Sequence, residues 1–173
     1  MNLEVYRQYC DVLEGATSFQ ENALLKARSL QEQLRREGMA SAVLADDSGL
    51  EVDGLGGRPG VLSARYVGEG ASWSQRRQVL LAEMCDVPDE QRNARFICVM
   101  ALISSNGTAA IGRGIVPGRI TREERGARGF GYDPVFIPAA ETQTFAEMSE
   151  EKKNSISHRR AAADALLEML MPS

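Results

Sequence analysis

Two adjacent aspartates, Asp46 and Asp47, follow an apolar run at 42–45 and precede Ser48 and Gly49. Carboxylates can hold a divalent metal ion, and polar side chains at the end of a strand are often presented to a cleft. Adjacent residues of an extended strand point to opposite faces, so we expect only one of the two carboxylates to work in a site. Asp, Ser and Gly also favour turns, and taken alone the motif is more typical of a plain turn.

His158 is the only histidine, so a Ser-His-Asp triad would have to combine it with Asp47 and a serine. No G-x-S-x-G motif accompanies it, and a single histidine excludes a zinc site built from several histidines. Its neighbours offer donors to an anion at a predicted helix start, where N–H groups and the dipole favour negative charge. These neighbours are Lys152, Lys153, Ser155, Ser157, Arg159 and Arg160. A solvated basic patch is the alternative.

The segment 129–134 places Phe130 and Tyr132 among glycines and ends in Asp133 and Pro134, which is a loop signal. An aromatic ring exposed on such a loop can stack on a planar base, and the neighbouring aspartate can accept hydrogen bonds from it. An ordinary tight turn with a buried Phe130 explains the same residues. Each of these three features is weak by itself.

The elements that would position these residues alternate between helical and extended patterns. Ser18 and Glu21 have the spacing of a capping box, and the apolar spacing predicts a helix over 19–36. Strands are expected at 42–45, from Leu50 onwards, and at 94–103 and 109–116, the last two joined by a turn at 105–107. Helices are expected at 73–85 and 157–170, and 121–131 reads as a loop. The final helix is expected to bury Ala161, Ala165, Leu166, Met169 and Leu170 on one side. The pattern predicts a mixed α/β protein.

Length and composition predict one domain over residues 1–173, long enough for a single sizeable core. A net charge of −4 opposes sequence-independent binding to nucleic acid, which needs a basic surface. No apolar run approaches the roughly 18 residues of a membrane span, and residues 1–15 lack the pattern of a secretory signal. We therefore expect a cytoplasmic protein that binds neither membranes nor nucleic acid, with Cys10, Cys85 and Cys98 reduced.

Taken together, the motifs closely resemble the inosine/xanthosine triphosphate pyrophosphatase family, also called the Ham1 or RdgB-like family. Three segments carry the match: 45–50 (ADDSGL), 129–136 (GFGYDPVF) and 153–159 (KNSISHR). The segments 19–27 (FQENALLKA) and 59–66 (PGVLSARY) support it, and the resemblance runs from about Glu14 to Leu170. It implies an elongated α/β fold with a mixed, twisted sheet, two lobes with a cleft between them, and a homodimer. It also implies Mg²⁺-dependent hydrolysis of ITP, dITP or XTP to a monophosphate and pyrophosphate.

The resemblance assigns roles residue by residue. It makes Asp47 the catalytic aspartate, which binds metal and accepts a proton from the attacking water, Glu14 the second metal carboxylate, and Ser48 a substrate contact. The base pocket is formed by Phe130, Gly131, Tyr132, Asp133, Lys153, His158 and Arg159. Lys153, His158 and Arg159 offer donors to the oxygens of the purine, so adenine, with an amino group at position 6, is expected to be disfavoured.

The front of the chain departs from the family pattern. Members open with a strand and a Ser/Thr-x-Asn-x-x-Lys loop that grips the phosphates, and residues 1–13 contain no such motif. Losing this unit would remove a phosphate clamp and a strand. We expect a start placed after that unit, with an intact site in the rest of the chain. The alternative is a nucleotide-binding or dimer-forming module with little or no catalysis.

Overall fold

The computed structural model describes residues 17–171 of the 173-residue chain, so Glu14 and Cys10 lie outside the described residues. The described chain forms two compact units. The first comprises residues 17–47, 98–114 and 162–171, and the second comprises residues 48–97 and 115–161. The single domain expected over 1–173 and the cleft expected between two lobes stay predictions.

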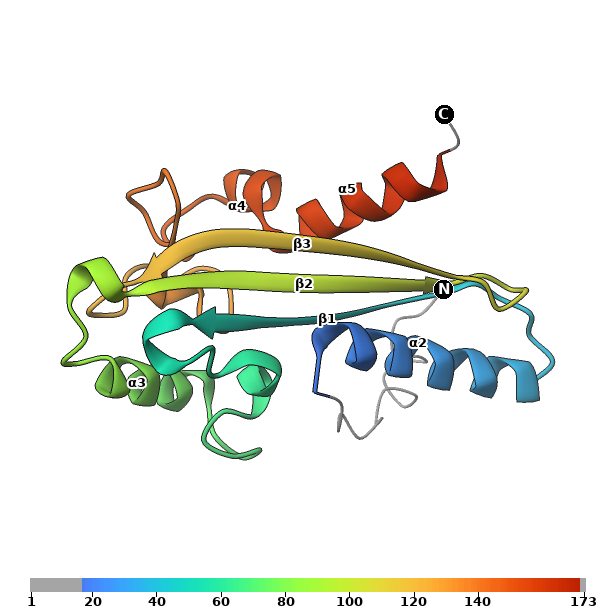
Figure 1. The fold of residues 1–173 in the computed structure, drawn as a ribbon, viewed down its shortest axis with the longest axis horizontal. Helices are drawn as coiled ribbons and strands as arrows, with labels where there is room; N and C mark the ends of the chain where they lie inside the picture. The colour runs from blue at the N-terminus through green and yellow to red at the C-terminus, as the bar shows by residue number, and fades with distance from the viewer. Residues whose placement is uncertain (1–16, 172–173) are drawn as a thin grey trace. The chain divides into compact units, whose positions relative to one another are not determined.

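Helix α2 (Phe19–Arg36) has the predicted bounds and belongs to the first unit (Figure 1). The Ser18 hydroxyl accepts a hydrogen bond from the Glu21 N–H at 3.2 Å, as a helix cap requires. The other half of the predicted capping box is replaced, because the Glu21 carboxylate accepts from the Thr17 hydroxyl at 3.3 Å. The apolar spacing works as expected, since Phe19, Ala23, Ala27 and Leu34 are all buried.

Strand β1 (Val43–Val52) is one continuous strand, so the predicted pair of short strands and the plain turn at 46–49 are wrong. The aspartates favour a turn only when their carboxylates bond to nearby backbone N–H groups. Here the Asp47 carboxylate is bound by Asn22 and Lys26 of α2 instead. Asp47 is buried and Asp46 is partly exposed. That only one of the two carboxylates works in a site stays a prediction.

Strands β2 (Asn93–Ile103) and β3 (Ala109–Ile120) form the predicted hairpin, and β3 runs four residues further than predicted before β4 (Phe136–Pro138). The sheet order is β1-β2-β3-β4, and neighbouring strands run antiparallel (Figure 1). The β3–β4 register pairs Gly118 with Pro138 and Ile120 with Phe136. The mixed α/β class is confirmed, with an antiparallel sheet in the described residues. None of the described helices is both long and apolar enough to cross a membrane.

The end of the chain contains two helices where one was predicted. Helix α4 (Glu150–Ile156) precedes α5 (His158–Leu170), so Lys152, Lys153 and Ser155 belong to α4. The two helices separate at Ser157, whose hydroxyl accepts from the Arg160 N–H at 3.2 Å and caps α5.

The buried face of α5 includes Leu166, as predicted, but otherwise differs from the predicted one. Ala162 and Leu166 are buried, whereas Met169 and Leu170 are exposed and Ala161 is only partly buried. Ala162 and Leu166 lie against β3 at Gly112, where a Cβ atom would come within 2.2 Å of the Ala162 carbonyl oxygen. The absence of a side chain at Gly112 therefore allows this face of α5 to pack closely on β3.

The second unit is built around helix α3 (Trp73–Glu83), which ends two residues before the predicted limit. Ser72 and Gln75 form the full capping box at its start. Short 3₁₀ helices lie at Asp53–Leu55, Gly60–Arg65, Asp89–Gln91 and Asp133–Val135. The core of this unit includes Leu50, Val52, Leu80, Met84, Phe96, Ile120, Val135, Phe136 and Phe145. Cys85 is exposed and Cys98 is buried, and the reduced state expected for the three cysteines stays a prediction.

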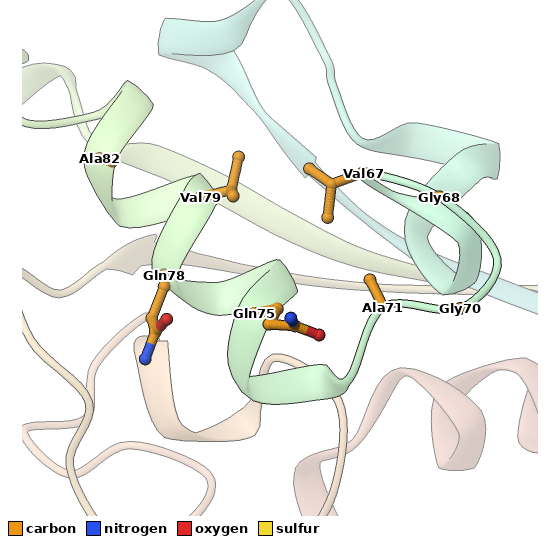
Figure 2. Close-up of a pocket in the computed structure, with 8 residues that line it drawn as sticks. All are labelled: Val67, Gly68, Gly70, Ala71, Gln75, Gln78, Val79 and Ala82. Carbon is orange, nitrogen blue, oxygen red and sulfur yellow. The ribbon is translucent and has the colours of Figure 1, made fainter.

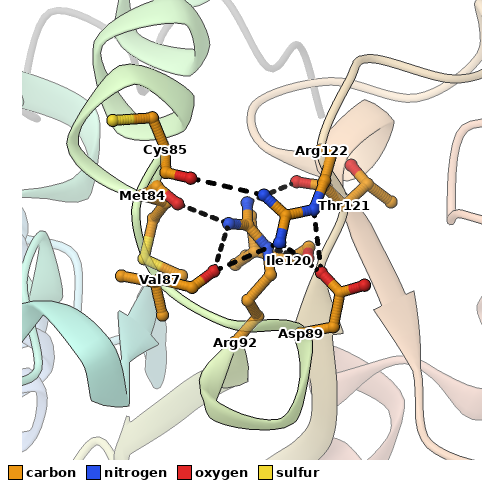
Figure 3. A network of polar contacts seen from close by, with 8 residues as sticks. All are labelled: Met84, Cys85, Val87, Asp89, Arg92, Ile120, Thr121 and Arg122. Carbon is orange, nitrogen blue, oxygen red and sulfur yellow. Dashed lines mark hydrogen bonds and ion pairs between the residues drawn. The ribbon is translucent and has the colours of Figure 1, made fainter.

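The Arg92 guanidinium joins the end of α3 to the end of β3 inside the second unit (Figure 3). It is almost fully buried and donates to the carbonyl oxygens of Ile120 at 2.9 Å and Thr121 at 2.7 Å. It also donates to the carbonyls of Met84 and Val87. Carbonyls at helix and strand ends often lack backbone partners. The Met84 carbonyl also accepts from the Val87 N–H, and Arg92 adds a charged donor to the carbonyls on both sides of this junction.

Replacing Arg92 with methionine is expected to lower the free energy of unfolding by about 3 kcal/mol, because buried carbonyls lose a charged donor. The matched control is Arg122→Met, since Arg122 lies in the same network but is largely exposed. It should cost less than about 1 kcal/mol. Urea unfolding of both variants measures the difference, and equal losses would show that the buried network does not hold the junction.

Candidate base pocket and catalytic carboxylate

A pocket of about 140 Å³ in the second unit gathers most of the predicted site residues. It is lined by Ser48, Gly49, Ser63, Ala64, Trp73, Phe96, Phe130, Gly131, Tyr132, Asp133, His158 and Arg159. Lys153 contacts the lining residues Phe130 and Asp133. The volume is below the roughly 300–1,000 Å³ of sites for drug-sized ligands, so it suits a flat ring system better than a whole nucleotide.

The Asp133 carboxylate fixes the loop that carries Phe130. Only 3% of Asp133 is exposed, and its Oδ2 accepts from the Phe130 N–H at 2.7 Å and from the Lys153 ammonium. This one oxygen therefore ties the loop to α4. Gly129 allows the arrangement: its φ is +74°, and a Cβ atom there would come within 2.2 Å of the same oxygen.

Phe130 presents its ring to solvent, and 58% of the residue is exposed. The Lys153 ammonium lies 4.7 Å and the Arg159 guanidinium 5.3 Å from the ring centroid, both within cation–π range. The alternative of a tight turn with a buried Phe130 is therefore wrong. An exposed aromatic with cations beside it is suited to stacking on a planar, oxygen-bearing ring.

Tyr132, the second aromatic of the loop, is buried, and its hydroxyl donates to the Ser63 carbonyl at 3.1 Å. Burial raises the pKa of the Tyr132 hydroxyl well above its ordinary value. The phenol therefore stays neutral across the physiological range and serves as a fixed part of the pocket wall. Of the two predicted aromatics, Phe130 is the one that offers a ring face.

His158 is the first residue of α5 and lies almost flat against Phe96, with ring centroids 4.8 Å apart and planes 9° from parallel. It is buried, and both rings line the pocket. Packing against Phe96 fixes the plane of the imidazole, while the Ser157 cap fixes the helix start that carries it. The imidazole edge is thus oriented by packing at the pocket.

The Asp47 carboxylate lies in the first unit, where two side chains of α2 hold it. The Lys26 ammonium donates to Oδ1 at 2.7 Å and the Asn22 amide donates to Oδ2 at 3.1 Å. Asn22 and Lys26 are one helical turn apart, so both project from the same face of α2. Sequence reasoning gave neither residue a role, although both belong to the family-like segment 19–27.

Asp47 and Asn22 carry oxygen atoms of the type that bind a divalent cation. The described residues contain no cluster of three or more histidine, cysteine or acidic side chains. Asp47 supplies a carboxylate, and the buried Asn22 Oδ1 accepts no hydrogen bond within residues 17–171. Carboxylate and amide oxygens fit Mg²⁺ in type. The predicted second carboxylate, Glu14, lies outside the described residues.

A larger, open depression of about 710 Å³ lies between α3 and the loop that follows Tyr66 (Figure 2). Val67 and Val79 line opposite sides of it, and its other lining residues are glycines, alanines and glutamines. It has no charged side chain and contains none of the predicted site residues. Its size therefore does not make it the candidate site.

A sequence model of the Ham1 family matches residues 1–169. The chain belongs to the Ham1 family. A dITP/XTP pyrophosphatase of Oceanobacillus iheyensis is 46% identical over 160 residues, which cover 92% of this chain and 79% of that protein. A dITP/XTP pyrophosphatase of Mycobacterium bovis is 48% identical over 157 residues, covering 91% of this chain and 74% of the relative.

Solved structures of Ham1 proteins share this fold. The Staphylococcus aureus Ham1 protein superposes with a TM-score of 0.87 at 36% identity, covering 98% of this chain and 85% of that one. Membership of the family is therefore shown by sequence and by fold. The roles of individual pocket residues are not set by that membership and rest on the geometry above.

Replacing Gly129 with alanine is expected to cost about 3 kcal/mol of unfolding free energy. Positive φ costs about 1–2 kcal/mol for alanine, and displacing the buried Asp133 loses hydrogen bonds to its carboxylate. Gly57→Ala is the control, because Gly57 also has a positive φ but no atom within 4 Å of its Cβ position. Gly57→Ala should lower the free energy of unfolding only by the backbone strain of alanine at a positive φ, about 1–2 kcal/mol. Urea unfolding compares the two, and equal costs would refute the constraint by Asp133.

Proposed function

We propose that this Ham1 family member hydrolyses ITP, dITP and XTP to the monophosphate and pyrophosphate and thereby clears damaged purine nucleotides. The observation that carries the proposal is the pocket around Phe130, where an exposed ring and the donors Lys153, His158 and Arg159 converge. Relatives that are 46–48% identical carry the name dITP/XTP pyrophosphatase. The proposal includes a cytoplasmic location and, as the resemblance implies, a homodimer. Analytical ultracentrifugation measures the oligomeric state.

In this proposal the pocket recognises a 6-oxo purine by stacking and by hydrogen-bond donation. Phe130 supplies the stacking face, and the cationic side chains beside it donate to purine oxygens. A 6-amino group is itself a donor, so adenine would leave the pocket's donors without acceptors. Such mismatched polar groups discriminate more strongly than missing apolar contact does. Ser48, consecutive with Asp47 on β1, contributes a hydroxyl to the same pocket.

Asp47 is proposed to accept the proton of the attacking water. The water oxygen bonds to the phosphorus, the bond to the bridging oxygen breaks, and pyrophosphate leaves with that electron pair. Lys26 and Asn22 fix the carboxylate in place, so it need not reorganise during the reaction. Asp47 and Glu14 are the proposed holders of Mg²⁺. When bound, the ion neutralises triphosphate charge and polarises the phosphorus.

The protein with Mg²⁺ is expected to release pyrophosphate from ITP, dITP and XTP at least about 100-fold faster than from ATP, because mismatched buried donors are costly. A coupled pyrophosphate assay at matched substrate concentrations measures the rates, with GTP as a further comparison. Equal rates for ITP and ATP would overturn the assigned substrate class. Calorimetric binding of ITP without turnover would replace the enzyme by a nucleotide-binding module. Release of inorganic phosphate would indicate a generic phosphatase.

Asp47→Asn is expected to lower kcat for ITP by about 10²–10⁴-fold, the usual contribution of a general base. The asparagine keeps the shape of the side chain, so the fold and the affinity for IMP should be retained. Asp46→Asn is the control, because the Asp46 side chain leaves the opposite face of β1 and lies 3.9 Å from the Cys98 thiol. A control that loses as much activity as Asp47→Asn would contradict the assignment of the base.

A further inference from the structure

Trp73 is the only tryptophan of the chain and lines the pocket that contains Phe130. It is the first residue of α3, directly after the Ser72 cap, and 36% of it is exposed. The other aromatic residues of the pocket, Phe96 and Tyr132, are buried. Phe130 and Trp73 are therefore the two lining aromatics with substantial surface for a ligand.

The indole of Trp73 is held by its neighbours. It meets the Tyr132 ring edge to face at a centroid distance of 5.6 Å, and the Arg76 guanidinium lies 5.1 Å from its centroid. Arg76 is fixed in turn, because it is buried and donates to the carbonyls of Gly68 and Ala71. The exposed part of the indole is thus rigid, which lowers the entropy cost of stacking a ligand on it.

The first turn of α3 also holds the loop that carries Phe130. The Gly131 Cα lies beside the benzo edge of the indole, because a Cβ atom there would come within 3.8 Å of it. One turn along the helix, Arg77 donates to the Gly131 carbonyl at 2.8 Å and pairs with Glu124 at 2.9 Å. Arg77 therefore restrains the loop without lining the pocket, and it offers a way to separate loop position from indole contact.

We propose that Trp73 is a second stacking surface of the pocket and contacts the purine ring, so that it favours two-ring over one-ring bases. The inference rests on the proposed function, in which the pocket receives a base. Tryptophan offers a large apolar face with little entropy to lose. A purine has a larger ring area than a pyrimidine, so it gains more stacking contact from a second aromatic surface.

The emission of wild-type protein tests the contact directly, because all tryptophan fluorescence comes from Trp73. Titration with IMP is expected to change the emission saturably, with a midpoint equal to the Kd from calorimetry. UMP should bind about 5-fold or more weakly, the lower limit for one lost base–aromatic stack. IMP binding in calorimetry without an emission change would overturn the inference.

Trp73→Ala is expected to raise KM for ITP by about 10-fold with kcat unchanged, because binding lost equally from ground and transition states has that signature. The ratio of kcat/KM for ITP over UTP should fall, and Trp73→Phe should restore part of both effects. Ile115→Ala removes a comparably exposed apolar side chain of the same unit outside the pocket and should match wild type.

Arg77→Gln separates contact from loop position. This substitution weakens the hydrogen bond to the Gly131 carbonyl but leaves the Trp73 indole in the pocket. It should therefore lower kcat/KM for ITP and UTP by similar factors. If it lowers the ITP:UTP ratio as much as Trp73→Ala does, selectivity comes from the loop and the inference is wrong. If ITP is hydrolysed and Trp73→Ala keeps wild-type KM and selectivity, the inference fails while the proposed function stands. If wild type releases no pyrophosphate from ITP, the proposed function fails, and IMP fluorescence still decides whether Trp73 contacts a base.

Discussion

The buried carboxylate of Asp133 is the constraint on which the pocket depends. A carboxylate taken out of water must have its oxygens satisfied, and Asp133 Oδ2 obtains the Phe130 N–H and the Lys153 ammonium. These two bonds bring a loop and a helix together at one atom. The same bonds leave the Phe130 ring outside and place a cation over it. The exposure of the Phe130 ring therefore follows from the two hydrogen bonds that satisfy the Asp133 carboxylate.

Polar contacts to backbone carbonyls restrain the residues around the pocket, in addition to the ring contacts of Trp73 and His158. The Tyr132 hydroxyl donates to the Ser63 carbonyl, and the Arg77 guanidinium donates to the Gly131 carbonyl. A glycine-rich loop has much conformational entropy to lose, so several such contacts are needed to keep one shape. Farther from the pocket, Arg92 has the same function for the strand and helix ends beneath it. The guanidinium groups of Arg77 and Arg92 thus restrain backbone segments by donating to their carbonyl oxygens.

Sequence periodicity predicted the regular elements well where local signals decide the structure. The bounds of α2 and the β2–β3 hairpin follow from a cap, apolar spacing and an Asn-Gly turn. The continuity of β1 could not be predicted, because the turn preference of Asp47 is overridden by Lys26, which lies 21 residues earlier. Trp73 was missed for a similar reason: a single aromatic at a helix start carries no motif, and only the fold places it beside the 129–133 loop.

The carboxylate proposed as the catalytic base and the pocket proposed to hold the purine base have different described hydrogen-bond partners. The hydrogen bonds described for Asp47 come from α2 within the first unit, whereas those of Asp133 lie within the second. Asp47 and the pocket residue Ser48 are consecutive residues of the continuous strand β1. Substitutions that share no partners are close to additive in free energy. Under the proposed function, substitutions among the described partners of Asp133 are therefore expected to leave the hydrogen bonds from Asn22 and Lys26 to the Asp47 carboxylate intact.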